Sequence, residues 1–403
     1  MKILKIWDAD YPWDIRVEKV CISLNDQGHE VHLLCRNLKG RPTFEKEKFG
    51  FVHRLPCFRN RRLNYLLSFP AFFNPIWIFY IFKLVKNNKI DLIMVRDLPM
   101  ALAGIVVGKF TRNPVVLDMA ENYPFLIDDI WEYEPFKKIN IIVRNRSLTR
   151  IVEKIVLETV DHVITVVEES QERVLQQCLR LENRVSIVSN TPELNMIRSS
   201  SVLPQQDREI FYGKYVLIYV GGLRLGRGID QIFEVIPTVV SKVPNFLFLI
   251  IGTGSIVEKL KDDVKILGIS EYVYFKGWVD FDKVFSYIAA ADVGVIPHYV
   301  TNHTNHTVPN KLFDYMGLGL PVVASSAKPI RRIIETEKCG LIFNNELDLA
   351  SSLIELSDAA KRKMLGDNGR KAVRSTYNWQ KSIENFSSTL KTVREQKTKQ
   401  YSK

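Results

Sequence analysis

A glycine-rich turn in the second half of the chain carries residue types that can bind a diphosphate. The β-branched and aromatic run Tyr215–Val220 is followed by Gly221 and Gly222, and Arg227 precedes Gly228 and a helical stretch. Glycines let backbone N–H groups approach an anion, a helix start adds a favourable field, and a guanidinium can clamp phosphate oxygens. The turn is neither a Walker A loop nor a GxGxxG fingerprint. A tight turn with an exposed arginine is the alternative, and it stays open.

Two further predicted strands of this half also end in glycines. They are Phe246–Ile251 and Tyr272–Phe275, and an aromatic residue follows the second one. Backbone without a side chain beside an aromatic ring can hold a flat nucleobase, although turn glycines and ordinary packing explain the same pattern. The residues at these two strand ends are Gly252, Gly254, Gly277, Trp278 and Val279.

The densest cluster of polar residues surrounds a predicted helix that starts after Pro309. Asn310 and Asp314 are four residues apart and therefore share a helix face. A carboxylate one turn into a helix can hold a ribose diol, while Lys311 and the first amides hold phosphate. His306 precedes the helix and could reach a sugar hydroxyl. The alternative is a set of surface residues on a helix whose apolar side chains pack the core.

Polar residues also follow three predicted strands of the first half. Because parallel strands end at one rim of a sheet, we expect these side chains to share that rim. Asp118 and Glu121 are the candidates for catalysis, and either could instead cap a helix. The acceptor-side candidates are Asp14, Arg16 and Arg96.

The elements that must position these residues alternate along the chain. Short β-branched runs alternate with helical stretches, which predicts right-handed βαβ units and parallel sheets. A Ser-, Pro-, Gln- and Asn-rich segment interrupts the pattern near residues 190–213. The predicted fold is therefore two facing, doubly wound, Rossmann-like α/β domains. The predicted boundaries are 1–195 for the acceptor-side domain, 196–213 for a linker, 214–378 for the donor domain, and 379–403 for a helix that packs back on the first domain and ends in a frayed basic tail.

Length and composition agree with two globular domains. The 403 residues are 46% hydrophobic and 25% charged, and the five cysteines never form a CxxC pair. The composition therefore excludes a fibrous chain, and the cysteine pattern does not favour a disulfide scaffold or a zinc ribbon. The net charge of +11 favours acidic partners, but no nucleic-acid-binding module is recognisable.

A basic run followed by an apolar stretch in the first half of the chain could contact a membrane. Residues 36–62 hold nine Lys and Arg, and the apolar stretch Leu63–Val85 follows them. Pro70 and Pro75 interrupt that stretch, so we expect no transmembrane helix. A buried helix and a helix lying on an anionic bilayer both remain open, as do a solvated face and an anionic-lipid patch for the basic run. No signal peptide is evident.

Taken together, the motifs resemble glycosyltransferase family 4, whose members are retaining enzymes with the GT-B fold. The resemblance rests on "VGGL…RG", "IIGTG", "FKGWV", "AADVGVIPH", "PNKLFDYMGLGLPVVAS" and "CGLIF", with "GHEVHLL" and "DMAENYP" in the first half. It implies a nucleotide-diphosphate sugar as donor, held mainly by the second domain, and no obligatory metal or other cofactor.

The resemblance also implies roles for individual residues. Arg227 would contact the diphosphate, and Gly277 to Val279 would line the base. The family's E-x7-E motif aligns on His306 and Asp314, so both glutamates are replaced. Ala120 stands where many relatives have a histidine that meets the donor sugar, which leaves Asp118 or Glu121 to take the polar role.

The predicted function is retaining transfer of a hexosyl or N-acetylhexosaminyl group from a nucleotide sugar to a glycan acceptor that is lipid-linked, in bacterial surface polysaccharide synthesis. The expected location is the cytoplasm, peripheral to the inner face of the cytoplasmic membrane. A nucleotide-sugar epimerase is one alternative. A nucleotide-sugar-binding protein with weak or no turnover is the other, because Ala120 and His306 depart from the family pattern.

Overall fold

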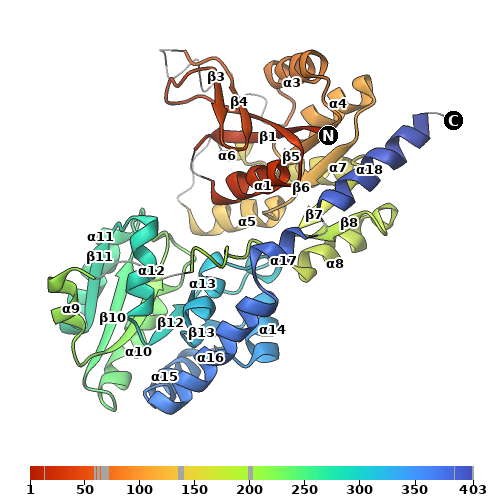
Figure 1. The fold of residues 1–403 in the computed structure, drawn as a ribbon. Helices are drawn as coiled ribbons and strands as arrows, with labels where there is room; N and C mark the ends of the chain where they lie inside the picture. Colours follow the sequence, from red (N-terminus) through yellow and green to blue (C-terminus); the bar gives the residue numbers. More distant parts are fainter. Residues whose placement is uncertain are drawn as a thin grey trace. The chain divides into compact units, whose positions relative to one another are not determined.

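The structure is a computed structural model that describes residues 1–12, 14–58, 60, 64, 72–134, 140–197, 203–384 and 386–401. The chain divides into two compact units. The first comprises Met1–Trp131, Pro135–Ser189 and Ser382–Lys403, and the second comprises Glu132–Glu134 and Asn190–Lys381. Both are α/β units built on a largely parallel sheet, as the alternating sequence pattern predicts (Figure 1).

The first unit is built on a sheet with the strand order β3-β4-β2-β1-β5-β6-β7-β8 among the described residues. All neighbours pair in parallel except β3 and β4. The order reverses direction between β1 and β5, so a topological switch point lies beyond their carboxyl ends. The strands are β1 Lys2–Asp10, β2 Glu30–Arg36, β3 Phe44–Glu47, β4 Gly50–Arg54, β5 Leu92–Arg96, β6 Val115–Asp118, β7 His162–Thr165 and β8 Val185–Ile187.

Helices cover this sheet with their apolar stripes. The core of one face joins Trp77, Ile81 and Val85 of α3 to side chains of α4 and α7 and to the strands. α18 lies against the same unit although it ends the chain, because Arg394 pairs with Asp91 at 2.6 Å (Figure 1). The helices of the unit are α1 Ile15–Asp26, α3 Pro75–Asn88, α4 Ala101–Thr111, α5 Tyr123–Tyr133, α6 Asn140–Val143, α7 Arg146–Leu157, α8 Glu168–Gln177, the 3₁₀ turn Leu179–Leu181, and α18 Phe386–Tyr401.

The second unit has a sheet with the order β11-β10-β9-β12-β13-β14, and every pair in it is parallel. Its inner strands are buried apolar runs such as Phe246–Ile251, as expected for a parallel sheet covered on both faces, whereas the edge strands β11 and β14 are mostly partly buried. The switch point lies between β9 and β12. The strands are β9 Tyr215–Val220, β10 Phe246–Ile251, β11 Val273–Gly277, β12 Val293–Ile296, β13 Val322–Ser325 and β14 Gly340–Phe343.

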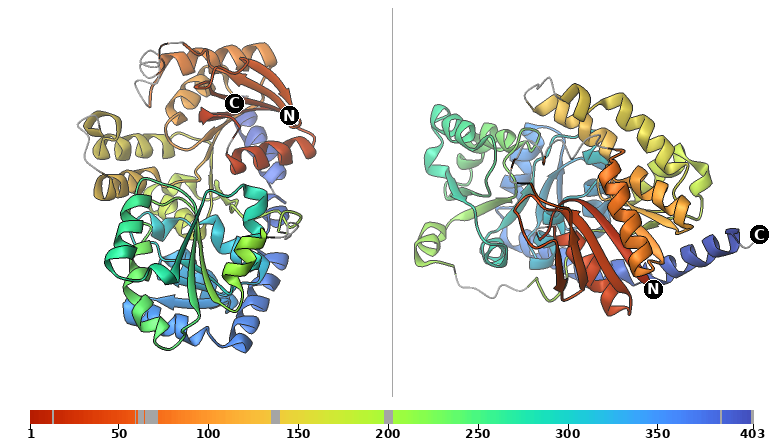
Figure 2. Two further views of the ribbon diagram at one scale, coloured as in Figure 1. Left: turned by 90° about the vertical axis from the view of Figure 1, so that its left-hand side faces the viewer. Right: turned by 90° about the horizontal axis from the view of Figure 1, so that it is seen from above.

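Helices flank the second sheet, drawn in green to blue in Figure 2. α10 packs against α15, and α13 packs against α16. The helices are α9 Gln205–Phe211, α10 Ile229–Val240, α11 Val257–Ile266, α12 Phe281–Ala289, α13 Asn310–Leu318, α14 Lys328–Glu337, α15 Glu346–Glu355, α16 Ala359–Ser375 and α17 Trp379–Ile383, with 3₁₀ turns at Ser270–Tyr272 and Thr304–His306.

The structure adds three local features that the sequence analysis did not predict. β3 is an antiparallel edge strand in the charged sequence FEKE, and its Glu45 pairs with the buried Arg54. The predicted linker contains α9, which is anchored by the fully buried Asp207. The basic tail is helical as far as Tyr401, because Lys397 pairs with Asp161 at 2.7 Å.

The basic run at residues 36–62 is not one solvated surface either. Arg54 is buried against Glu45, and Arg36 pairs with Asp8. Arg59, Arg61 and Arg62 lie outside the described residues, as do Trp13 and most of residues 63–71. Of the apolar stretch that ends at Val85, the described part is half-buried helix α3. Within the part of the chain described, no helix is long and apolar enough to cross a bilayer.

Candidate functional site

The switch point of the second unit brings the predicted diphosphate residues together. The loop after β9 runs from Gly221 to Gly228, and the loop after the neighbouring strand β12 begins with Pro297 and His298. Gly228 adopts φ +65° at the start of α10, and a Cβ there would lie 1.9 Å from the carbonyl oxygen of Pro297. Glycine is therefore required where the two loops meet.

Arg227, His298 and Lys311 converge at this point from three elements. Arg227 Nη1 lies 3.4 Å from Nδ1 and 3.5 Å from Nε2 of His298, which is 2% exposed. The Lys311 ammonium lies 3.7 Å from the centre of the Tyr219 ring. In the described part of the chain no carboxylate forms an ion pair with Arg227 or Lys311. Burial, followed by the charge of Arg227, holds the pKa of Lys311 well below its usual value, against the opposing effect of Asp314. An added anion would favour the charged form of Lys311 and is therefore compatible with this site.

The predicted donor glycines have packing roles that the structure makes specific. Gly221 adopts φ +146°, and a Cβ there would lie 2.9 Å from Lys311 Nζ. A Cβ on Gly252 would lie 2.0 Å from the carbonyl oxygen of Gly221, and one on Gly254 would lie 1.9 Å from that of Leu223. The two loops therefore touch backbone to backbone, while Gly222 is exposed beside them. Contact of these glycines with a donor stays a prediction.

α13 presents its start to the same region. Pro309 at the N-cap has no capping side chain, so the first amides of the helix are not covered by one. Asn310 is exposed and accepts a hydrogen bond from Asn190 at 2.8 Å, and Asp314 is partly buried one turn later. His306 lies in the preceding 3₁₀ turn, and its Nδ1 donates to the Asn302 carbonyl at 2.7 Å. That bond orients the ring of His306. The contact of His306 with a sugar hydroxyl stays a prediction.

Trp278 and Val279 follow β11 and line a pocket of about 350 Å³. Trp278 is 74% exposed, so the ring is not core packing. Gly277, at φ +77°, accepts from the amide of Gly252 at 2.8 Å and so joins this loop to the glycine-rich ones. The volume falls in the range of small-ligand sites, and a flat apolar wall beside it suits a base.

Asp207 binds two residues that line this pocket, Lys276 and Tyr287. The sequence analysis did not identify it. The carboxylate accepts from Lys276 at 2.7 Å, Tyr287 at 2.6 Å and Tyr274 at 3.1 Å. Burial alone would raise the pKa of Asp207, but these three bonds outweigh it and lower the pKa. The only signal in the sequence was an acid in a Pro- and Gln-rich segment. Its partners are more than sixty residues away, and no local pattern connects them.

In the first unit, Asp118 and Arg16 belong to a buried ion network. Asp118 is 1% exposed; it accepts from Lys5 at 2.8 Å and from Arg16 at 2.7 Å and 3.2 Å. Arg16 also donates to the Val188 carbonyl at 2.8 Å. Burial would raise the pKa of Asp118, but Arg16 and Lys5 outweigh it and hold the pKa far below its usual value. These contacts give both residues a structural role, and their predicted site roles stay predictions.

Asp14 and Arg96 are brought together at the switch point of this unit. Asp14 caps α1 by accepting from the Val17 amide at 2.8 Å, and its second oxygen faces Arg96 at 3.3 Å. Arg96 also pairs with Asp97 at 3.1 Å. Asp14 and Arg96, two of the three acceptor-side candidates, are therefore neighbours, and their contact with an acceptor stays a prediction.

Glu121 lies in the loop after β6 and is only partly buried. Asp97, which adopts φ +58°, accepts the backbone amides of Ala120 at 2.9 Å and Glu121 at 3.0 Å through one oxygen. A single carboxylate thus holds this short loop at the carboxyl end of the sheet. Asp97 directly follows Arg96 in the sequence, and the sequence analysis assigned it no role.

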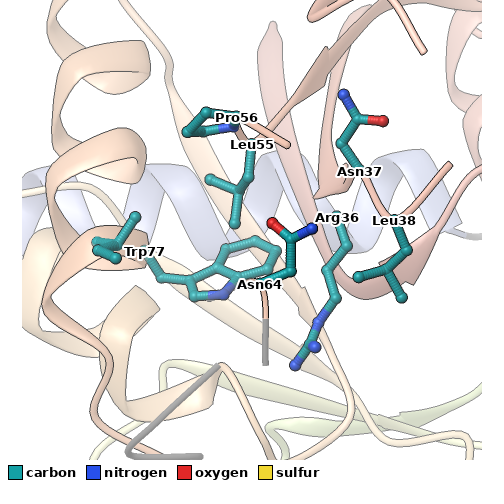
Figure 3. Close-up of a pocket in the computed structure, with 8 residues that line it drawn as sticks. Arg36, Asn37, Leu38, Leu55, Pro56, Asn64 and Trp77 are labelled. Atoms are coloured by element: carbon teal, nitrogen blue, oxygen red, sulfur yellow. The ribbon is translucent and has the colours of Figure 1, made fainter. Parts of the chain in front are cut away.

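A pocket beyond β2 and β4 lies at the same edge of this sheet (Figure 3). It joins Arg36 and the buried Asn37 to an apolar wall formed by Leu55 and Trp77. Its volume is about 30 Å³, which suits ordered water better than a sugar ring. Within the described residues, no group of three or more His, Cys, Asp or Glu side chains is arranged to hold a metal ion.

Two family models match the chain, one in each unit. Residues 15–191 match the model described as Glycosyltransferase Family 4. Residues 214–359 match the model described as Glycosyl transferases group 1. The second match contains every donor-side residue considered above, from Gly221 to Asp314.

Individual proteins extend the likeness to almost the whole chain. An uncharacterized glycosyltransferase of Methanocaldococcus jannaschii is 22% identical, over 90% of this chain and 89% of that protein. The alpha-monoglucosyldiacylglycerol synthase of Streptococcus pneumoniae is 21% identical, over 82% of this chain and 72% of that protein. Among solved structures, Anabaena HepE in complex with UDP-glucose superposes with a TM-score of 0.65 at 16% identity, covering 100% of this chain and 99% of that one.

Proposed function

Because this chain is a glycosyltransferase of the group 1 and family 4 type with the GT-B fold, we propose that it transfers a hexosyl or N-acetylhexosaminyl group from a nucleotide-diphosphate sugar to a lipid-linked glycan acceptor. The donor half of the proposal is supported by the convergence of Arg227 and Lys311 at the switch point, where neither side chain forms an ion pair with a carboxylate among the described residues. Such cations stabilise the charge of a leaving diphosphate. The nucleotide sugar in the HepE complex supports the same donor class.

The proposed reaction retains the anomeric configuration. The acceptor attacks from the face that the diphosphate leaves, and a diphosphate oxygen receives the acceptor proton. Arg227, Lys311 and the start of α13 neutralise the growing charge, which is the task of a metal ion in other phosphate chemistry. We therefore expect no obligatory metal, and treatment with EDTA should leave the transfer rate unchanged.

Replacing Arg227 with alanine should weaken binding of the cognate nucleoside diphosphate. A hydrogen bond to a charged group contributes about 1.5–3 kcal/mol, which corresponds to roughly a tenfold to 150-fold increase in Kd. Calorimetric titration with UDP and GDP measures it. Arg224→Ala is the matched control, because Arg224 is exposed in the same loop. Unchanged affinity in a folded Arg227→Ala protein would remove Arg227 from the donor site.

The proposed setting is surface polysaccharide synthesis in a bacterium, with the enzyme peripheral to the inner face of the cytoplasmic membrane. The outer face of α3 supports this setting. Phe79 and Phe82 are 61% and 41% exposed, Lys83 and Lys86 are exposed beside them, and no acidic residue lies between Phe72 and Ile90. Exposed aromatic rings among cations suit an anionic bilayer surface.

Flotation with lipid vesicles tests this attachment. We expect binding to anionic vesicles that weakens with salt, because exposed charges are screened over about 10 Å at 0.1 M. Reversing Lys83 and Lys86 to glutamate should lower the bound fraction on the order of tenfold or more. The control reverses Lys261 and Lys265, which are exposed on α11 of the second unit. Equal flotation with neutral and anionic vesicles at every salt concentration would contradict the electrostatic part.

Transfer itself is tested with a nucleotide sugar and a lipid-linked acceptor. Formation of a glycosylated lipid that retains the donor's anomeric configuration is the expected result. Release of an altered nucleotide sugar without any acceptor would indicate an epimerase instead. Binding of the donor with no product in either assay would leave a binding protein.

A further inference from the structure

His298 is a buried imidazole inside the diphosphate site that the predicted mechanism does not use. It directly follows β12, at the switch point, as the last letter of the motif "AADVGVIPH". Its backbone carbonyl accepts from Ser325 Oγ at 2.6 Å, which anchors the residue to the neighbouring strand β13. Both ring nitrogens lie within 3.5 Å of the same guanidinium nitrogen of Arg227. The backbone of His298 is therefore anchored, and its ring lies beside a permanent positive charge.

The groups that face His298 are almost all cationic. Arg227 approaches from the loop after β9, Lys311 from α13, and His303 from its own loop; the phenol of Tyr219 lies beyond Lys311. Asp314 is the carboxylate that acts on Lys311. Burial, followed by Lys311, Arg227 and His303, holds the pKa of His298 well below its usual value. Without a bound anion, the imidazole is therefore neutral at neutral pH.

A bound diphosphate would reverse this balance. Its oxygens carry negative charge into a site where Arg227 and Lys311 lie close to His298. An opposite charge within about 4–6 Å favours the charged form of a group. In the protonated imidazole both ring nitrogens can donate a hydrogen bond, whereas the neutral imidazole has one donor nitrogen and one acceptor nitrogen. The same cations that now repel a proton from the ring would be neutralised by the ligand.

We propose that the site takes up one proton from solvent when a diphosphate binds, and that His298 is the group that receives it. This inference rests on the proposed donor site at Arg227 and Lys311. It adds a further diphosphate-binding residue to that site and makes donor affinity depend on pH. The imidazolium adds positive charge beside the leaving group, whose oxygen keeps the electron pair of the broken glycosidic bond.

Calorimetry measures the proton directly. Titration of the full chain with UDP and with GDP at pH 8, in buffers that differ in ionisation enthalpy, gives the number of protons exchanged. At this pH the nucleoside diphosphate is fully ionised, so the proton must go to the protein. We expect uptake of about one proton, and a Kd that rises up to about tenfold for each pH unit above neutrality. His298→Gln should abolish both effects, while His303→Gln, in the same loop, should keep them.

The outcomes distinguish a failure of the proposed donor site from a failure of the proposed proton uptake. Failure of both nucleotides to bind the wild-type protein would count against the proposed function itself. Binding without proton uptake, or full uptake in His298→Gln, would overturn this inference and leave the donor site standing. If His298→Gln melts at a lower temperature than the wild type, spectra of the wild-type protein with ¹⁵N-labelled histidine replace it. One ring should change from the neutral to the protonated form as UDP is added, and no change in any ring would overturn the inference.

Discussion

Replacing Asp118 with asparagine is expected to destabilise the first unit by about 3–5 kcal/mol, because it removes the carboxylate that pairs with both Lys5 and Arg16 and leaves these two buried charges without their counter-ion. Lys5 is fully buried and Arg16 nearly so, so neither cation can recover hydration without local unfolding. A loss of this size lowers the melting temperature of the unit on the order of 10 °C. Differential scanning calorimetry of the whole chain measures it.

Asp128→Asn is the matched control in the same unit. Asp128 also pairs with two arginines, Arg146 and Arg150, but all three side chains are at least a quarter exposed. Exposed ion pairs contribute about 0–1 kcal/mol, so this variant should melt close to the wild type. If the two variants melt at the same temperature, the buried network does not stabilise the unit. Since the pKa of Asp118 is held low, its contribution is complete above about pH 4 and is lost only as the pH falls further.

This network also shows what local sequence can and cannot predict. The three strands whose bounds the sequence analysis gives were predicted almost correctly; Tyr215–Val220 and Phe246–Ile251 match residue for residue, and Tyr272–Phe275 corresponds to β11, Val273–Gly277. Each is a short apolar run between turn residues, so the information is local. The partners of Asp118 lie more than one hundred residues away, and its position at a strand end suited a catalytic residue as well as a buried ion.

The donor half of the site was more predictable than the acceptor half for the same reason. Arg227, Lys311 and Asp314 lie in segments whose turn and helix signals are strong, and strand order alone carries them to one switch point. The sequence analysis did not identify the roles of His298, Asp207 and Asp97, and each of these residues acts through contacts to a segment that is distant in the sequence. A lone histidine or aspartate in a loop has no local signature of such contacts.

The first unit also explains why Glu121 is the stronger catalytic candidate of the two acids. Asp118 has both oxygens engaged by buried cations, whereas the Glu121 side chain is partly exposed on a loop that Asp97 holds through two backbone amides. A group that orients the acceptor or the donor sugar must be reachable and must be held in place. Ala120, beside it, offers no polar side chain.

Glu121→Gln is therefore expected to lower the transfer rate on the order of 10²-fold or more, the scale of a positioned acid–base group. The Kd for UDP or GDP should stay unchanged, because Arg227 and Lys311 lie in the second unit. The melting temperature should also stay unchanged, since the side chain is only partly buried. Steady-state transfer kinetics, titration and a melting curve on the same preparation separate these three effects.

Glu169→Gln is the matched control for that loss. Glu169 is likewise partly buried and follows β7, the strand beside β6, but it starts a helix and belongs to no part of the proposed site. Its rate should equal that of the wild type. Normal turnover in Glu121→Gln would exclude Glu121 from the mechanism. His306 would then be the next candidate to mutate, because Asp14 and Arg96 already face one another across the switch point of the first unit. A Glu121→Gln enzyme that transfers slowly but binds the donor normally would support a role of Glu121 in the transfer step.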